Sequence, residues 1–144
     1  RAGLRLLPEL DFNTAPPCDV LIVAGGVADG ALACPRTLAW LRTQSGRAQI
    51  TASVCTGAFP LAEAGVLTDQ EVTTHWEDLA DLQRRYPALR VTDRQRCWVD
   101  GGRLVTSAGI SAGIDMSLHL VARLGGPALA ERTARQMDYA WQAA

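Results

Sequence analysis

Cys55 stands in the sequence context that most favours chemistry. It follows a short, mostly apolar run, 50–54, and precedes Thr56-Gly57 and a segment, 58–64, that is predicted to be a helix ended by Gly65. A thiol on a sharp strand-to-helix turn projects from the backbone, as in a nucleophile elbow. The unpaired N–H groups of the new helix would favour the reactive thiolate. The alternative is that Cys55 is a small buried hydrophobe, as most free cysteines are.

The elements around Cys55 must position it, and they alternate between strand and helix. The apolar run 20–24 is typical of a strand that is buried on both faces of a parallel sheet. Alternation of this kind predicts an α/β domain with a mainly parallel sheet. Strands are predicted at 20–24, 49–54, 71–74, 89–92, 97–100 and 104–106, and helices at 35–43, 58–64, 75–86, 111–124 and 127–141.

Unusual sequences follow four of these strands. They are Gly25-Gly26, Cys55-Thr56-Gly57, His75-Trp76 and Ser107-Ala-Gly109. In parallel α/β sheets the ligand site lies outside the carboxyl ends of the strands, so these segments are predicted to meet at one edge. A purely structural cysteine would have no reason to share that edge with a diglycine and a histidine.

Each of these segments has a candidate role and a simpler alternative. Cys55 would be the nucleophile, and the N–H groups of Thr56, Gly25 and Gly26 could hold a developing negative charge, as an oxyanion hole does. The diglycine could equally be a plain turn. His75 could orient the substrate or take part in proton transfer, or it could simply pack beneath the cysteine turn.

Local signals also predict where several helices begin and end. Thr74 and Glu77 have the spacing of a capping box, which would start the third helix. Gly46 is expected to end the first helix, and Ser111 to cap the helix after the last strand. The segment 100–102, Asp-Gly-Gly, predicts a hairpin turn.

The composition is that of one ordinary globular domain covering residues 1–144. The formal net charge is −1, which gives no indication of a nucleic-acid or anionic-membrane partner. No apolar run approaches the length that crosses a bilayer. The chain has 4 cysteines, which lie far apart without a CxxC pair; they are interpreted as reduced thiols of a cytoplasmic protein without a metal site, with a disulfide as the alternative.

Taken together, three motifs resemble the ThiJ/PfpI superfamily, which is similar to class I glutamine amidotransferases. They are the segment 52–57 (ASVCTG), the segment 72–76 (VTTHW) and the segment 105–115 (VTSAGISAGID), in this order. The resemblance runs from about residue 16 to about residue 141. It implies a flavodoxin-like three-layer sandwich with a mainly parallel sheet.

Within the superfamily the chain most resembles the isonitrile hydratases, which add water to an isonitrile and release an N-substituted formamide. The resemblance makes Cys55 the nucleophile, Gly26 the glycine behind the oxyanion site, and His75 the histidine near the reactive cysteine. Gly109 and Ile110 match the loop that lines the pocket. It implies a small-molecule substrate, no cofactor and a homodimer, often with the site near the interface.

The sequence departs from the family in two respects. Thr56 follows Cys55 where the PfpI-type peptidases carry a histidine, which argues against a Cys-His protease. Family members also begin with a strand-helix unit whose acidic residue points at the cysteine, and residues 1–19 do not match it. We therefore expect this first unit to be missing here, and neither Glu9 nor Asp11 has the context to replace its carboxylate.

Two alternatives stay open beside the hydratase. The ligand-sensing domains of AraC-type transcription regulators resemble this chain as well, and such a regulator would carry a helix-turn-helix segment after residue 144. The other alternative is a redox or stress-response protein of the family, in which Cys55 would be oxidised to a sulfinic acid.

Overall fold

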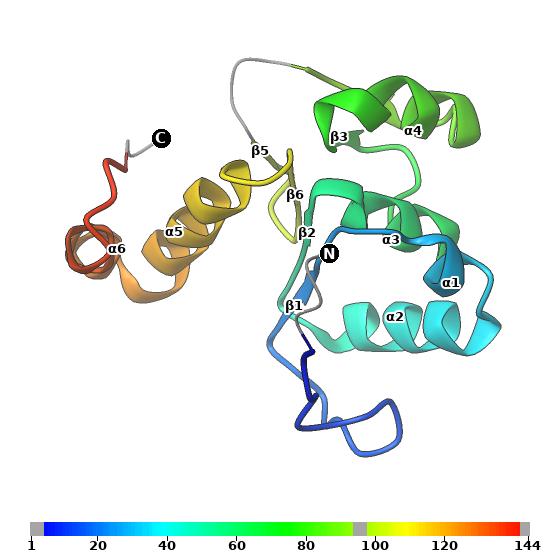
Figure 1. The fold of residues 1–144 in the computed structure, drawn as a ribbon, viewed down its shortest axis with the longest axis horizontal. Helices are drawn as coiled ribbons and strands as arrows, with labels where there is room; N and C mark the ends of the chain where they lie inside the picture. The colour runs from blue at the N-terminus through cyan, green and yellow to red at the C-terminus, as the bar shows by residue number, and fades with distance from the viewer. Residues whose placement is uncertain (1–4, 94–97, 142–144) are drawn as a thin grey trace.

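The computed structural model describes residues 5–93 and 98–141, and it has a mainly parallel sheet (Figure 1). The four-stranded sheet has the order β1-β2-β6-β5, in which β1, β2 and β6 are parallel and β5 is antiparallel to β6. The fold class predicted from the alternation of strands and helices is therefore confirmed. The strands are β1 (Val20–Val23), β2 (Ile50–Val54), β6 (Leu104–Ser107) and β5 (Trp98–Asp100).

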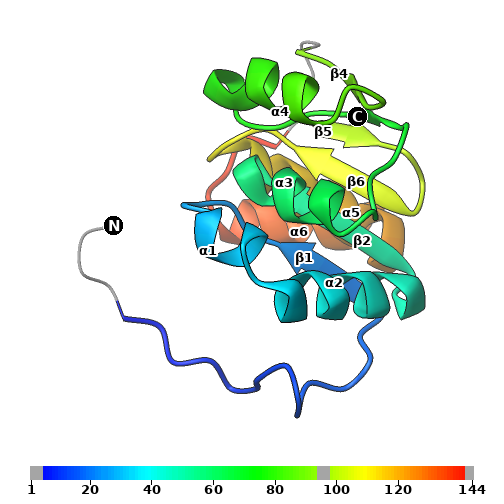
Figure 2. The same ribbon diagram turned by 90° about the vertical axis from the view of Figure 1, so that its right-hand side faces the viewer.

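Helices cover both faces of this sheet. Figure 2 shows α2 (Pro35–Arg47) and α3 (Ala58–Glu63) in front of the sheet and α5 (Ala112–Gly125) behind it. The helix α6 (Pro127–Gln136) packs on α5, and the short helix α1 (Asp29–Leu32), which was not predicted, lies beside α2 and α3.

A second, smaller sheet lies beside the first. It pairs β3 (Glu71–Val72) in parallel with β4 (Arg90–Val91), and α4 (Leu79–Arg85) connects them after the 3₁₀ turn Trp76–Asp78. The predicted strands 89–92 and 97–100 therefore belong to different sheets.

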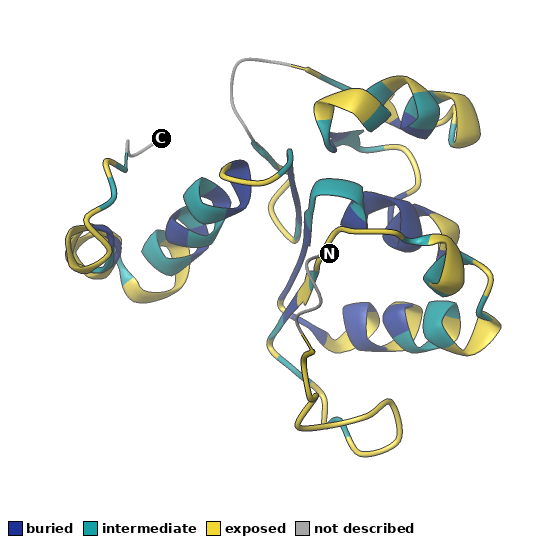
Figure 3. Ribbon diagram, viewed as in Figure 1, coloured by how far each residue is buried: buried dark blue, intermediate teal, exposed yellow. Residues whose placement is uncertain are grey.

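The core forms where short side chains let the elements approach. On β2 and β6, Ala52 and Val105 have no exposed surface and pack against Met116 of α5. On the other face, Leu61 of α3 belongs to a buried cluster that includes Leu82 of α4. Figure 3 shows this burial concentrated on the central strands and on the sheet-facing sides of α3 and α5.

Several predicted helix ends are wrong, and a tertiary contact or local geometry explains each. α2 runs one residue past Gly46, because the helix stops only where Ala48 becomes extended before β2. α6 ends at Gln136 rather than at residue 141, because Asp138, two residues after Gln136, has a left-handed backbone with φ 50°. The Thr74 hydroxyl donates to the carbonyl of Cys55 at 2.8 Å instead of closing a capping box.

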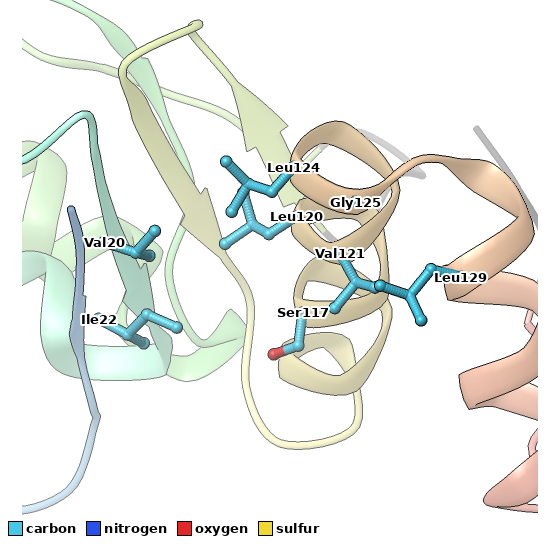
Figure 4. A pocket seen from close by; sticks show the side chains of 8 residues that line it. All are labelled: Val20, Ile22, Ser117, Leu120, Val121, Leu124, Gly125 and Leu129. Carbon is cyan, nitrogen blue, oxygen red and sulfur yellow. The ribbon is translucent and has the colours of Figure 1, made fainter.

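The strand β1 leaves an apolar groove open at one side of the sheet. β1 is an edge strand of the sheet, and Ile22, on the face towards α5, is 49% exposed. Figure 4 shows Val20 and Ile22 across from α5, with Leu129 of α6 beyond; the cavity between them has a volume of about 410 Å³. Within residues 5–93 and 98–141, no element covers this part of the sheet.

A charged cluster holds the β5–β6 hairpin, which the segment 100–102 predicted, against α5. One oxygen of Asp100 lies 2.6 Å from His119 Nε2, and Arg123 Nη1 donates to both carboxylate oxygens at 3.0 Å. Partial burial alone would raise the pKa of Asp100, but the hydrogen bonds from His119 and from the Gly102 N–H, together with the Arg123 charge, hold it below its usual range.

Asp100→Asn should reduce the free energy of unfolding by about 1 kcal/mol at pH 7, a value that allows for solvent screening of this partly exposed group. Because the folded pKa is depressed, the contribution is present above the unfolded pKa of about 4 and is lost as the pH falls through the folded value. Urea titrations at pH 7 and pH 3 should therefore show that the difference in free energy of unfolding between the wild type and Asp100→Asn becomes smaller in acid. Glu131→Gln on the exposed face of α6 is the control; a difference that becomes larger in acid would contradict the assignment.

Candidate functional site

Cys55 lies on a strained turn between β2 and α3. Its φ is 56°, a left-handed conformation that is uncommon outside glycine. β2 ends at Val54, a 3₁₀ turn spans Cys55–Gly57, and α3 starts at Ala58. The thiol is free and partly exposed. It lies at the carboxyl end of β2, the central one of the three parallel strands. Backbone strain of this kind costs about 1–3 kcal/mol and is concentrated at functional sites.

Two glycines allow this turn to sit against the end of β1. A Cβ on Gly25 would lie 2.6 Å from the Cβ of Cys55, and a Cβ on Gly57 would lie 2.2 Å from the carbonyl oxygen of Val23. Any side chain at either position would push the turn away from β1. The first glycine of the pair is therefore needed for a close approach to Cys55, and it is more than a plain turn residue.

Gly26 and Thr56 join the two strand ends by a reciprocal pair of hydrogen bonds. The Gly26 N–H donates to the Thr56 hydroxyl, and the hydroxyl donates to the Gly26 carbonyl, each at 2.8 Å. Gly26 has a φ of 143°, which a residue with a side chain rarely adopts. The hydroxyl proton of Thr56 and the N–H of Gly26 are thus both already used in this pair of hydrogen bonds.

His75 is held in place from two sides. The preceding residue, Thr74, donates its hydroxyl to the Cys55 carbonyl, as described above. A Cβ on Gly109 would lie 2.3 Å from His75 Nδ1, so the absence of a side chain there admits the imidazole ring. The structure therefore brings together the four segments that the sequence placed at one edge of the sheet.

Two contributors to this edge were missed from sequence. Thr74 and Glu77 were interpreted as a capping box, but Thr74 binds the cysteine turn, and a Glu77 carboxylate oxygen lies 3.3 Å from His75 Nε2. Their positions immediately before and two residues after the histidine were the available signal. Ser107, by contrast, is fully buried and donates to the Ser53 carbonyl at 3.3 Å, so it shapes the end of β6.

Exposed apolar side chains lie within or directly after three of the site segments. Val27, Trp76 and Ile110 come directly after Gly26, His75 and Gly109, and they are 87%, 71% and 83% exposed. Ile110 also has a φ of 54°, which is strained for a β-branched residue. Ile110, the predicted pocket-lining residue, is thus largely exposed, and it borders a cavity that is also lined by Val54.

A second free thiol, Cys34, lies at the start of α2. Hydrogen bonds from the side chain and the backbone N–H of Thr37 hold the pKa of Cys34 below its usual value. Cys18 is also free, and Cys97 lies outside the described residues. Within the described ranges, no three His, Cys, Asp or Glu side chains are grouped to hold a metal ion, and no helix is long and apolar enough to span a membrane.

The fold and site define an α/β protein with a cysteine site at the carboxyl edge of a mainly parallel sheet. The chain belongs to the DJ-1/PfpI family, whose sequence model matches residues 2–123. It is 40% identical to an isonitrile hydratase of Pseudomonas putida over 139 residues, which cover 96% of this chain and 59% of the hydratase. The resemblance to the ThiJ/PfpI group stated from the three motifs is confirmed.

Two further relatives broaden this picture. The transcriptional regulator GbdR of Pseudomonas aeruginosa is 33% identical over 95% of this chain and 37% of its own length. A ThiJ/PfpI family protein from Pseudomonas syringae, with a solved crystal structure, is 32% identical and has a TM-score of 0.83 over 99% of this chain and 58% of its own. The chain therefore spans less than two thirds of each of these relatives.

Gly25→Ala should destabilise the chain by about 1–3 kcal/mol, because the added methyl group would overlap the Cβ of Cys55. Gly30→Ala is the matched control, since its Cβ would meet nothing within 4 Å. Urea denaturation measures both free energies of unfolding. Equal effects of the two substitutions would show that the close approach of Gly25 to Cys55 is unimportant.

Proposed function

We propose that this chain carries the cysteine site of a hydratase that adds water to a small electrophilic carbon, with an isonitrile as the substrate class. The observation that carries the proposal is the strained Cys55 turn, held against Gly25, Gly26 and His75 at the strand ends. The 40% identity to an isonitrile hydratase supports this substrate class. In this proposal the turn is a nucleophile elbow.

The proposed reaction begins with attack by the Cys55 thiolate on the isonitrile carbon. The sulfur–carbon bond forms and the same carbon takes up a proton, which gives a thioimidate. Water then adds to this carbon, the carbon–sulfur bond breaks, and the thiolate leaves as the nitrogen gains a proton. The sum is one isonitrile and one water converted to one N-substituted formamide, without any oxidant or cofactor.

The hydrogen bonds between Gly26 and Thr56 support one choice of the group that stabilises charge in these steps. The Gly26 N–H already donates to the Thr56 hydroxyl, so the Thr56 backbone N–H at the start of the turn is our candidate oxyanion donor. In this proposal the Thr56 side chain acts by tying Gly26 to the elbow, because its own proton goes to the Gly26 carbonyl. The hydroxyl is therefore a positioning group.

Cys55→Ala should abolish isonitrile loss in the full-length protein, since no other group replaces the attacking sulfur. Cys34→Ala is the matched control, because it removes a free and partly exposed thiol remote in sequence from the site. Gas chromatography of the isonitrile and the formamide measures both rates. An unchanged rate in Cys55→Ala would refute the nucleophile assignment.

The proposed chemistry also needs an acid, and the open groove offers a place for the element that supplies it. By resemblance, this acid is a carboxylate on a strand-helix unit. We propose that such a unit of the longer protein pairs with the free edge of β1 and lays its helix on Val20, Ile22 and α5. The groove continues to Val54 and Ile110, which adjoin Cys55 and Gly109, so a helix along it would lead a side chain towards the thiol.

This placement predicts that Ile22 becomes buried in the longer protein. Ile22→Ala should cost about 2–4 kcal/mol there and less than about 1 kcal/mol in the 144-residue chain, where Ile22 is 49% exposed. Val27→Ala, at a residue that is 87% exposed, should cost little in both. Denaturant titrations of the two lengths provide the comparison, and equal costs for Ile22→Ala would place the strand-helix unit elsewhere.

A second candidate function is ligand sensing within a transcription regulator. It is favoured by the 33% identity to GbdR across nearly the whole of this chain. In that case the site around Cys55 would bind a small molecule without turning it over. Isothermal titration with a non-hydrolysed ligand, together with absence of isonitrile turnover in the full-length protein, would favour the sensor.

A further inference from the structure

We infer that Glu77 is a positioning residue for His75. In the neutral form of the ring it keeps the proton on Nε2, and this leaves Nδ1 as a buried hydrogen-bond acceptor at the Cys55 site. The inference about the ring rests on geometry, and only its consequence for turnover rests on the proposed function.

The first observation is the placement of the two side chains on one short turn. His75 directly precedes the 3₁₀ turn Trp76–Asp78, so Glu77 returns towards the ring from within that turn. Its Oε2 atom lies 3.3 Å from His75 Nε2. The imidazole side chain is 19% exposed, whereas the carboxylate is 63% exposed and stays in contact with water. An ionised carboxylate at this position favours a proton on the nitrogen that faces it.

The second observation is independent and concerns the other ring nitrogen. His75 Nδ1 is buried and has no hydrogen-bond partner. It lies against Gly109, where a Cβ would be only 2.3 Å away. A buried polar atom without a partner costs about 1–3 kcal/mol, and such an atom in a native structure needs an explanation, such as strain, a catalytic role or a bound water.

The two observations together define the hydrogen-bonding character of Nδ1. With the proton on Nε2, Nδ1 offers a lone pair and accepts a hydrogen bond. The ring cannot tilt away easily, because Gly109 packs on it and the Thr74 hydroxyl anchors its backbone to the Cys55 carbonyl. Nδ1 is therefore an acceptor that lies against Gly109, with no surface open to a water. In the proposed hydration His75 acts by keeping its ring in one orientation beside the Cys55 turn.

Glu77 differs from its acidic neighbour in this respect. Asp78 lies on the same turn and carries the same charge, but its backbone N–H donates to the His75 carbonyl and its side chain makes no capping bond to α4. Asp78→Ala thus removes one negative charge from the turn without removing the group that faces Nε2. This makes it a matched control for Glu77→Ala.

The test is nitrogen NMR of the ¹⁵N-histidine-labelled 144-residue chain, recorded at a pH at which the imidazoles are neutral. The wild type and Asp78→Ala should show His75 Nδ1 as a pure acceptor resonance. Glu77→Ala should move it towards that of a mixture of both tautomers, whereas Glu77→Gln, whose side-chain oxygen is able to accept a hydrogen bond from Nε2, should keep it. A tautomer mixture in the wild type, or no change in Glu77→Ala, would overturn the inference.

Turnover gives a second readout in the full-length protein. Glu77→Ala should lower kcat for isonitrile hydration roughly tenfold, because the His75 ring is less well oriented at the site, and Asp78→Ala should leave it unchanged. If the protein turns over no isonitrile, the proposed function fails while the NMR result still decides the role of Glu77. If turnover occurs and Glu77→Ala does not reduce it, the positioning of His75 has no part in the reaction.

Discussion

The contact between the backbone at the end of β1 and the cysteine turn is the constraint on which the site depends. Gly25 and Gly57 leave no side chain between the two segments, and a Cβ at either position would lie under 3.0 Å from its neighbours. The reciprocal hydrogen bonds of Gly26 and Thr56 then fix the separation. Because the turn cannot relax towards β1, Cys55 keeps its left-handed conformation, and its side chain stays at the strand end.

The same contact explains why the other site segments gather here. The Cys55 carbonyl is freed from the sheet by the turn and accepts the Thr74 hydroxyl, which brings His75 to the same edge. Thr73 is tied to β6 in turn, since its N–H donates to the Thr106 hydroxyl at 2.9 Å. Gly109, just beyond β6, leaves room for the imidazole ring. The polar contacts of the site thus run between strand ends and follow from the order of strands in the sheet.

The sequence was most informative where a local pattern and the sheet topology agree. The alternation of strands and helices, the meeting of four segments at the carboxyl edge and the hairpin at 100–102 could all be predicted, because each depends on local chemistry and on one rule for parallel sheets. The roles of Thr74 and Glu77 could not. Their capping-box spacing is a local signal, but in the structure a long-range hydrogen bond to Cys55 and a contact with His75 replace it. Both β3 and β4 were predicted as strands, but their pairing in a separate sheet was not, since it depends on long-range contacts that no local pattern records.

In the proposed reaction the Cys55 sulfur becomes bonded to the isonitrile carbon during turnover. The most direct measurement is acid quenching of the full-length protein during reaction with excess isonitrile, followed by mass spectrometry of the peptide that contains Cys55. We predict a mass increase of one isonitrile on Cys55, with Cys18 and Cys34 unmodified. Continuing formamide production with Cys55 unmodified at every quench time, and undiminished by Cys55→Ala, would contradict it.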